Sequence, residues 1–558
     1  MKKLSQYEAV PGFNQTASAL FKENNLNIEN QEDFEKLFPD QVTPINSYND
    51  FFSQISILKN TDKFIDVIKQ HNKQEPICIL GDYDVDGIMA TTIMCHSLNK
   101  LGYATHFIIP NRLNDGYGMQ TEALEKDILE NQTTLFITVD NGITAKESVS
   151  KVKELGAEII ITDHHLPDAT LLPETLIIDP KYNQDEFSDI CGAYVAFKLC
   201  FALYNQVSPE NLNVIETLLP LAGIATIADM MPALEENRQL IQMTMNIINE
   251  VKFTNQKNSP LYKILYSLGG QNFFKSDTML ATEELISYSV GPAINAISRV
   301  NGDVYDVVQK IIFCLGKPWA YIPSYISMNY ARQRMSKELF SDFKFDKNYN
   351  LSQVFIYNPE EYEYNIKGIL GLIANRVANK FKIVSLIGSY KDNGSVEFSG
   401  RSTPNYDLHT GIDRLKELLP DLGINGGGHS QAMGVRIENA TEDNIKKFKD
   451  ALEEDIKTHS EPYVPTVFEW EPEMEQEIIG TMEALQPYGA NFSKLKFSYS
   501  GIFLEYDYEN KIAIISDYKF RMFIPNEEIE NYIGTDIDIM FTVSFNSSDG
   551  PIFNVINE

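Results

Sequence analysis

The sequence predicts a multidomain α/β protein whose main sheet is parallel. Short apolar runs alternate with helix-like stretches from residue 76 onward, a pattern typical of a parallel sheet with helices on both faces. A second alternation of this kind begins at residue 352, and strand-like runs dominate after residue 461. A chain of 558 residues can bury several cores, so about two to four domains are expected.

The first α/β pattern supplies a series of expected strands joined by helices. Helical stretches such as 121–131 and 145–156 lie between them. Residues 1–70 are typical of mixed helix and loop, residues 190–345 are largely helical, and the run 324–343 predicts a long connecting helix. The expected strands are residues 76–80, 105–110, 135–140, 158–165 and 175–179.

The rest of the chain predicts two further domains. A strand at 352–358 opens a second α/β pattern that continues to about residue 460, and the runs after it predict a small barrel or sandwich. We therefore expect an N-terminal extension, a main α/β domain that includes the connecting helix, a second α/β domain and a terminal β domain. Their expected boundaries are 1–70, 71–345, 346–460 and 461–558.

The composition is that of an ordinary globular protein, with 43% hydrophobic and 22% charged residues. No apolar run reaches the roughly 18 residues of a membrane span, and the stretch MKKLSQYEAVPGFNQ lacks the apolar core of a secretory signal. The five cysteines include no C-x-x-C pair, which favours buried, reduced thiols over disulfides or a zinc site. We therefore expect a cytoplasmic protein with no membrane association.

The net charge of the chain is −31, which argues against a broad, sequence-independent grip on nucleic acid. It leaves room for a locally basic groove, or for a site where bound divalent cations invert the local field. Charge alone therefore does not decide whether the substrate is a nucleic acid.

Carboxylates and imidazoles follow several of the expected strands. The motif GDYDVDG comes directly after the first strand, VDNGIT includes the end of the third, TDHH ends the fourth, and GIATIADMMP places an aspartate after another apolar run. Because ligands of open α/β sheets bind beyond the carboxyl ends of the strands, these side chains should meet at one rim. The candidates are Asp82, Asp84, Asp86, Asp140, His164, His165 and Asp229.

Single residues of this kind have ordinary explanations, since a lone aspartate after a strand is often a helix cap. Several carboxylates at one edge are different, because they repel one another and raise each other's pKa unless cations neutralise them. Oxygen and imidazole ligands together favour Mn²⁺ or a comparable ion over a thiolate-type zinc site. More than four ligands indicate two metals about 3.5–4 Å apart, the arrangement used in phosphoryl chemistry.

The four motifs, in this order, resemble those of the DHH phosphoesterase superfamily, and within it the RecJ family of bacterial exonucleases specific for single strands. The resemblance implies a DHH catalytic domain, a DHH-associated domain joined to it by a long helix, and an OB-like barrel at the C-terminus. The segment LQPYGANF (485–492) departs from the PFGxGN pattern that is usual in the family. Further similar segments are IPNRLNDGYGM (109–119), GPAINAISR (291–299), NYARQ (329–333), KGILGLIANR (367–376), FSGRS (398–402), GGGHSQAMG (426–434) and LQPYGANF (485–492).

The resemblance also implies roles at the metal centre. Asp84 and Asp86 would each ligate one metal, and Asp140 would bridge the two. His164 and Asp229 would complete the second site. Asp82 would lie in or beside the first site, and His165 would lie near the scissile phosphate as an electrostatic stabiliser. The implied cofactor is a pair of Mn²⁺ ions, with Mg²⁺ as the second candidate.

A second group of residues matches the site at which the family holds a terminal 5′ phosphate. Three consecutive glycines let backbone N–H groups approach an anion closely, although turns use glycine too. Arginines suit a terminal phosphate through bidentate contacts, and structural salt bridges are the alternative for Arg112 and Arg299. The candidates are Arg112, Arg299, Ser399, Arg401, Gly427, Gly428 and His429.

The terminal domain would hold the strand by stacking bases on aromatic rings, with basic side chains on the backbone. The alternative for each aromatic residue is a place in the core of the domain. The residues considered are Phe492, Tyr499, Phe503, Tyr518, Phe520, Lys494, Lys496, Lys519 and Arg521.

The resemblance implies a 5′ to 3′ exonuclease specific for single-stranded DNA, using a two-metal mechanism in recombination and repair. The implied partners are single-stranded DNA with a 5′ phosphate, a single-strand-binding protein and a helicase, and we expect a monomer. One alternative keeps the chemistry but acts on short oligoribonucleotides or cyclic dinucleotides, which the acidic charge favours. The other is a non-catalytic replication scaffold, which the complete ligand set disfavours. The sequence leaves open the physiological metal, processivity, RNA tolerance and the role of residues 1–70.

Overall fold

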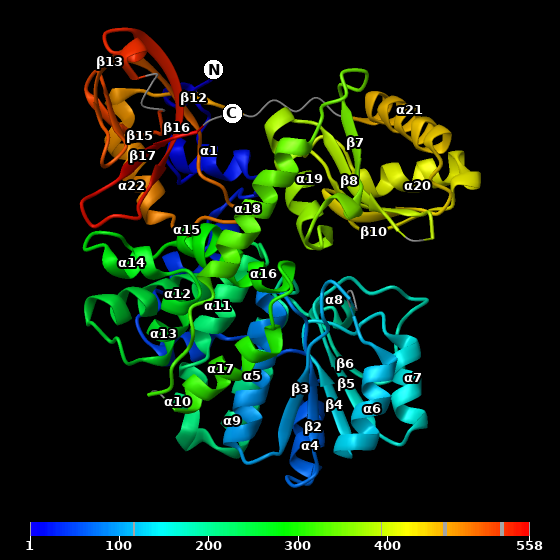
Figure 1. The fold of residues 1–558 in the computed structure, drawn as a ribbon. Coiled ribbons are helices and arrows are strands. Elements are labelled where there is room, and N and C mark those ends of the chain that lie inside the picture. The colour runs from blue at the N-terminus through cyan, green and yellow to red at the C-terminus, as the bar shows by residue number, and fades with distance from the viewer. Residues whose placement is uncertain are drawn as a thin grey trace. The chain divides into compact units, whose positions relative to one another are not determined.

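The structure is a computed structural model that describes residues 2–556 except 115–117, 318, 392, 461–465 and 525–528, and it leaves out the side chain of His429 (Figure 1). The chain folds into two compact units. The first unit comprises Met1–Asn295, Asp303–Ile326 and Thr466–Asn557. The second comprises Ala296–Gly302 and Ser327–Pro465.

The first unit contains the predicted parallel sheet, in the order β3-β2-β4-β5-β6. Its central strands are almost wholly apolar because helices cover both faces. The expected strands are confirmed, but the middle three end two or three residues earlier than expected. The strands are β2 (Ile77–Leu80), β3 (Thr105–Ile108), β4 (Leu135–Thr138), β5 (Glu158–Thr162) and β6 (Leu176–Ile178).

Helices cover the two faces of this sheet. On one face, α6 (Thr121–Asn131) and α7 (Lys146–Glu154) bury Leu124 and Val149 against the sheet side chains, among them Phe136. On the other face lie α5 (Val85–Lys100), α9 (Gly192–Val207) and α11 (Leu219–Ala228), which pack against one another. These three helices are buried nearly all round, which explains their continuous apolar sequence.

The helical region of the first unit continues through α12 (Glu235–Phe253) and α17 (Val304–Gly316). Among the described residues, no single helix is long and apolar enough to cross a membrane. One bent pair, Pro209–Glu216 and Leu219–Ala228, has the required length and composition only when its two helices are taken together.

The N-terminal residues form helices that contact both the helical region and the C-terminal domain. The first strand, β1 (Lys2–Lys3), pairs with β12 (Phe468–Glu469), and α1 (Gln15–Glu23) packs against α22 (Glu475–Ala484). The segment that the sequence describes as an extension is therefore part of the first unit.

The C-terminal domain is a closed five-stranded barrel, as predicted. The strand order β13-β14-β15-β17-β16 closes through pairing of β16 with β13, and the β15–β17 pair is parallel. This is an OB-like arrangement. The strands are β13 (Phe497–Asp507), β14 (Ile512–Ile515), β15 (Tyr518–Arg521), β16 (Asp536–Ser544) and β17 (Ile552–Val555).

The second unit is the second α/β domain that the sequence predicts. Its mixed sheet has the order β10-β11-β9-β8-β7, in which only the β7–β8 pair is parallel. The strands are β7 (Ser352–Tyr357), β8 (Val384–Tyr390), β9 (Val396–Arg401), β10 (Ile424–His429) and β11 (Ala432–Ile437).

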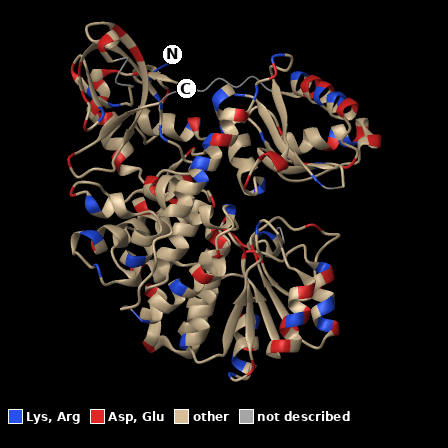
Figure 2. Ribbon diagram, viewed as in Figure 1, with Lys and Arg blue, Asp and Glu red and all other residues tan. Residues whose placement is uncertain are grey.

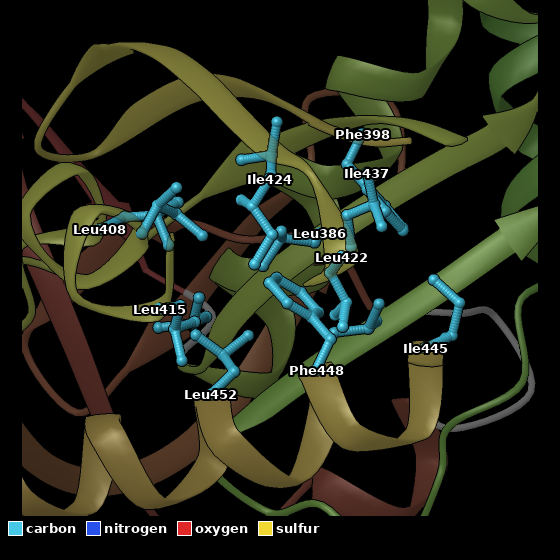
Figure 3. Packing of buried hydrophobic residues seen from close by; sticks show 14 of the residues in the cluster. Leu386, Phe398, Leu408, Leu415, Leu422, Ile424, Ile437, Ile445, Phe448 and Leu452 are labelled. Atoms are coloured by element: carbon cyan, nitrogen blue, oxygen red, sulfur yellow. The ribbon is translucent and has the colours of Figure 1, made fainter. Parts of the chain in front are cut away.

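Helices cover both faces of this second sheet as well. The expected connecting helix is α18 (Ile326–Asp342), which packs with α19 (Lys367–Phe381) on one face. On the other face, α20 (Leu408–Leu418) and α21 (Glu442–His459) enclose an aliphatic core, in which Phe448 of α21 points toward sheet residues such as Leu386 (Figure 3).

Candidate functional site

The first strand of the parallel sheet ends in the aspartate motif. Asp84 caps helix α5, since its carboxylate accepts the Gly87 N–H at 3.1 Å. Glycine is required on both sides: a Cβ at Gly81 would lie 1.9 Å from the Thr91 hydroxyl, and one at Gly87 would lie 2.5 Å from the carbonyl oxygen of Asp82. The motif thus combines tight packing with three closely spaced carboxylates at a helix N-terminus, of which Asp82 and Asp86 are buried.

Helix α9 supports this motif from the side. The carboxylate of Asp86 is buried and accepts the N–H groups of Gly192 and Ala193, each at 2.7 Å. These donors lie at the N-terminus of α9, where the helix dipole favours a negative charge. Asp86 is therefore held in a fixed orientation by backbone donors.

The third expected strand delivers Asp140 in a left-handed backbone conformation, with φ of 63°. A Cβ at Gly192 would lie 2.5 Å from the Asp140 Cβ, so a glycine at the start of α9 makes room for this carboxylate. Next to it, buried Asn141 donates from its side-chain amide to the carbonyl oxygens of Leu80 at 3.0 Å and Val139 at 2.9 Å. This contact ties the ends of β2 and β4 together.

The fourth strand end is organised by Asp163, the residue of the TDHH motif that was not among the expected ligands. Its Oδ1 accepts from His165 Nδ1 at 2.7 Å and from the His164 N–H at 2.8 Å. Its Oδ2 accepts the Ile143 N–H at 2.9 Å. Asp163 therefore fixes both histidines, and its position immediately before them was the signal available in the sequence.

Asp229 reaches the same place from a helix rather than a strand. The apolar run before it forms α11, and Asp229 is the C-cap of that helix. This agrees with the expectation that residues 190–345 are largely helical, because an Ala- and Leu-rich run surrounded by other helices folds as a buried helix.

The structure brings the candidate ligands together in two neighbouring groups, and the ligand atoms within each group lie within 4.8 Å of one another. The Asp82 group consists of Asp82, Asp84 and Asp140. The His164 group consists of Asp86, His164 and Asp229. Asp140 lies between the groups, because its Oδ1 is 3.1 Å from His164 Nε2. Figure 2 shows acidic residues gathered where the strands of the parallel sheet end.

The electrostatics of the two groups fit bound cations. Burial and the neighbouring carboxylates raise the pKa of Asp140 well above its usual value, and burial with Asp86 and Asp84 does the same for Asp229. Burial lowers the pKa of His164 to about 4, so its imidazole is neutral and able to ligate. The buried Asp82 Oδ1 has no hydrogen-bond partner within the described part of the chain. This donor set suits Mn²⁺ or Mg²⁺.

His165 differs from His164 in charge. Burial alone would lower the pKa of His165, but the hydrogen bond and charge of Asp163, with Asp229 and Asp86, raise it to about 9. Its side chain is 36% exposed. His165 thus places a positive charge at the accessible edge of the carboxylate groups.

Arg112 lies in the same unit, with its guanidinium 4.8 Å from the centre of the Tyr83 ring. Its charge acts to lower the pKa of Asp82, which places it near the aspartate motif. Of the similar segment 109–119, residues 115–117 lie outside the described residues.

The other phosphate candidates lie in the second unit, around the first turns of α19. Arg299 Nη1 donates to the Gly368 carbonyl oxygen at 3.0 Å. A Cβ at Gly371 would lie 3.4 Å from Arg401 Nη2 and 3.5 Å from Ser399 Oγ. A helix N-terminus with arginine and serine side chains beside it is a suitable setting for an anion.

The glycine run forms strand β10 at the edge of the sheet, rather than a turn. Gly427 pairs with Gly434, which pairs with Ser399 on β9, so the exposed glycine backbone and Ser399 lie in one row across the sheet. Gly428 has φ of 139°, in the region that favours glycine. The side chain of His429 lies outside what the structure describes.

The structure shows that several of the aromatic residues considered for base stacking are buried in the C-terminal domain. Phe492, Phe503 and Phe520 are fully buried, so these rings cannot stack on bases. Alternate residues of barrel strands point inward, which explains why an aromatic sequence fills the core. Lys494 is engaged by Glu283 and Glu284. Tyr499 and Tyr518 are half-buried, and Lys519 and Arg521 are exposed.

Comparison with known families and proteins identifies the two α/β parts. Residues 76–226 match the N-terminal domain of the DHH family, and residues 352–458 match the DHHA1 domain. The chain is 30% identical over 403 residues to the single-stranded-DNA-specific exonuclease RecJ of Bacillus subtilis, covering 70% of this chain and 47% of that one. It is 28% identical over 383 residues to the RecJ of Salmonella typhimurium, covering 65% and 63%. The chain thus spans about half to two thirds of the length of these relatives.

Solved structures share the fold. The crystal structure of RecJ from Thermus thermophilus in complex with Mn²⁺ matches with a TM-score of 0.70 and 19% identity, covering 100% of this chain and 77% of that one. The complex of the same protein with Mg²⁺ matches with a TM-score of 0.64 and 17% identity, covering 100% and 76%. Both matched domains, the curated relatives and the common architecture lead to one conclusion: the chain belongs to the DHH superfamily and is RecJ-like.

Proposed function

We propose that this protein is a divalent-metal-dependent exonuclease that degrades single-stranded DNA from its 5′ end. The observation that carries the proposal is the meeting of the Asp82 group and the His164 group at the carboxyl edge of the parallel sheet. The names of the relatives, single-stranded-DNA-specific exonucleases, support the substrate. A purely structural role gives no reason to bury so many mutually repelling carboxylates.

Each ligand group would hold one cation, Mn²⁺ or Mg²⁺, with Asp140 shared between them. Two divalent cations so placed stabilise the attacking and leaving oxygens of an in-line displacement at phosphorus. The backbone donors on Asp86 keep its carboxylate oriented before any cation binds. His164, neutral through burial, contributes a nitrogen ligand without adding charge.

His165 would stabilise the negative charge that develops on the phosphate. Asp163 holds the proton on His165 Nδ1, which leaves the Nε2–H of the charged ring available to a phosphate oxygen. In this assignment His165 contacts the substrate and Asp163 is a positioning residue.

The second unit would bind the terminal 5′ phosphate. Arg299, Ser399 and Arg401, with the N-terminus of α19 and the exposed Gly427–Gly428 backbone, offer several donors and two positive charges. Such a pocket explains selectivity for ends, because only a free 5′ end would fill it. Arg112, in the first unit, is proposed separately to contact a phosphate of the bound strand.

The remaining proposals concern the cellular setting. By similarity to its relatives, the protein would act in recombination and repair in the cytoplasm, as a monomer, on strands supplied by a helicase and coated by a single-strand-binding protein. We also propose that the chain divides into four functional parts, with boundaries at residues 1–70, 71–345, 346–460 and 461–558.

The test uses the purified protein, Mn²⁺ and a single strand labelled at its 3′ end, with either a 5′ phosphate or a 5′ hydroxyl. We expect progressive shortening of the labelled strand, faster with the phosphate, and none with Asp140→Ala. A wild-type protein that leaves every DNA strand intact would refute the DNA exonuclease.

The acidic net charge of −31 supports a second candidate, a phosphodiesterase for short oligoribonucleotides or cyclic dinucleotides. Parallel assays on a short RNA oligonucleotide and a cyclic dinucleotide distinguish the two. Turnover of these substrates without degradation of long DNA would establish the second candidate instead.

A further inference from the structure

A cavity of about 290 Å³ lies at the carboxyl ends of β2 and β3, beneath helix α6. Two of its lining residues adjoin the metal centre in sequence, since Gly81 precedes Asp82 and Asn141 follows Asp140. The other walls include Ile108, Pro110, Met119 and Leu124. None of these residues belongs to either ligand group, so the proposed chemistry leaves the cavity without a role.

The lining selects the kind of ligand. Most of the walls are aliphatic, no lysine or arginine is among the described lining residues, and Glu122 contributes a negative charge. A phosphate would be repelled from such a cavity, whereas a neutral ring would bury apolar surface there. The volume lies near the lower end of small-molecule sites, about 300–1,000 Å³, which suits one ring system.

Asn141 adds a specific polar feature. It is buried, with 2% of its surface exposed, and its amide nitrogen is fixed by the carbonyl oxygens of Leu80 and Val139. Its Oδ1 has no hydrogen-bond partner in the described part of the chain, although a buried oxygen of this kind normally accepts one. Because Asn141 lines the cavity, its unpaired amide oxygen would accept from an N–H group on the edge of a bound nucleobase.

The position within the fold supports a ligand as well. In the order β3-β2-β4, the chain turns to opposite sides of β2, so the sheet has its switch point between β2 and β4. Ligands of doubly wound sheets bind outside the strand ends at such a point. Here the two ligand groups and the cavity both lie at this switch point. One nucleotide could therefore place its phosphate at the ligand groups and its base in the cavity.

We propose that this cavity receives the base of one of the two nucleotides that flank the scissile phosphate. The proposal rests on the proposed function and deepens it, because it assigns a base-binding subsite to the nuclease centre. The bound base would fix the sugar, and with it the phosphate, over the metal groups. Hydrolysis would then slow when that base is missing.

The experiment compares strands that carry an abasic tetrahydrofuran residue at the first or the second nucleotide with the intact strand. Ala123, which lines the cavity from α6, is replaced by phenylalanine to fill it. Leu129→Phe is the matched control, since Leu129 lies on the same helix and is 79% exposed. Ala123→Val provides the same comparison with less added volume if the larger side chain disturbs folding.

With wild type and Leu129→Phe, we expect one of the two abasic strands to be cut on the order of 10-fold more slowly than the intact strand, the size of one base contact. With Ala123→Phe, the intact strand should slow to the abasic rate, while the abasic strand keeps its wild-type rate. The position of the sensitive abasic residue identifies the nucleotide.

Two outcomes would overturn the subsite. One is equal cutting of intact and abasic strands by the wild type, and the other is an unchanged preference for the intact strand in both Ala123 variants. Either leaves the exonuclease intact. If the wild type cuts no strand, the proposed function itself fails, and the base-binding proposal fails with it.

Discussion

At the scale of single residues, the metal centre depends on neighbours that hold each ligand in place. Asp163 is the clearest case, because its carboxylate accepts from the His164 backbone, the His165 ring and the Ile143 N–H. Asp140 is the opposite case, a buried carboxylate whose surroundings raise its pKa. Asp163 therefore positions the two histidines, whereas Asp140 is repelled by neighbouring carboxylates, and bound cations would relieve that repulsion.

We expect Asp163→Asn to reduce kcat on single-stranded DNA by about 10- to 100-fold, the usual effect of removing a residue that orients a ligand. The amide would lose the charge that stabilises protonated His165. Asp168→Asn, in the exposed loop that follows, is the control. Steady-state kinetics with Mn²⁺ titration check this, and an unchanged kcat would contradict the positioning role.

Asp140→Asn should change the response of stability to metal. In EDTA we expect the variant to unfold at the same temperature as wild type or higher, because one buried negative charge is gone. At Mn²⁺ about 100 times above its dissociation constant, the wild type should gain about 2.7 kcal/mol, and the variant less. Calorimetry with and without Mn²⁺ measures both. Equal stabilisation of the two proteins would argue against Asp140 as a ligand.

At the scale of elements, the second unit depends on contacts between its helices and on the glycine strand. Asp455 of α21 accepts from Arg414 Nε at 2.8 Å, from Arg414 Nη2 at 2.6 Å and from the Tyr406 hydroxyl at 2.7 Å. Burial would raise the pKa of Asp455, but these donors lower it below its usual 3.8. This cluster links the two helices that close the aliphatic core.

We expect Asp455→Asn to cost about 1–3 kcal/mol of unfolding free energy at pH 7, as the charged hydrogen bonds are lost. Because the folded pKa is depressed, the contribution of Asp455 is fully present above pH 3.8 and is lost as the pH falls through the lower folded value. The difference between wild type and variant should therefore narrow in acid. Urea unfolding followed by circular dichroism at neutral pH and at a pH below 3.8 tests the sign.

The glycine strand offers a matched pair of substitutions. Gly428→Ala should destabilise the β10–β11 hairpin, because its φ is 139° and a Cβ would lie 2.6 Å from the Ala432 carbonyl oxygen. The expected cost is about 1–3 kcal/mol. Gly427→Ala meets no atom within 4 Å and should fold normally, yet weaken the preference for a 5′ phosphate. Thermal unfolding and the end-labelled assay separate these effects.

At the scale of the whole molecule, buried ion pairs join distant parts of the first unit. Arg238 of α12 is fully buried, pairs with Asp40 at 2.5 Å and donates to the carbonyl oxygens of Gln486 and Pro487. It therefore links the N-terminal residues, the helical region and the segment before the barrel. Residues 1–70 thus contribute contacts that hold the barrel segment to the helical region of the first unit.

Arg238→Ala should destabilise the first unit by about 3–5 kcal/mol, because it leaves Asp40 buried without its partner. Lys310→Ala, which removes an exposed pair with Asp306, should cost less than about 1 kcal/mol. Denaturant unfolding followed by fluorescence is suitable, since both tryptophans, Trp319 and Trp470, lie in the first unit. Similar losses in the two variants would contradict the linking role.

The sequence by itself determined the parallel sheet, the second α/β domain and the order of the polar motifs that follow the strands. It did so because apolar runs, their spacing and the aspartate motifs are local signals. The same local order predicted which residues would share the rim, including Asp84 and Asp140.

Only the tertiary structure decided the rest, because it depends on contacts between residues far apart in the chain. Closure of the barrel turned Phe503 and Phe520 inward. Strand pairing placed Gly427 at an exposed edge, and the Asp40–Arg238 pair joined the N-terminal residues to the barrel segment. A sequence pattern specifies which side chains are apolar or charged, whereas their partners are fixed only when the chain folds.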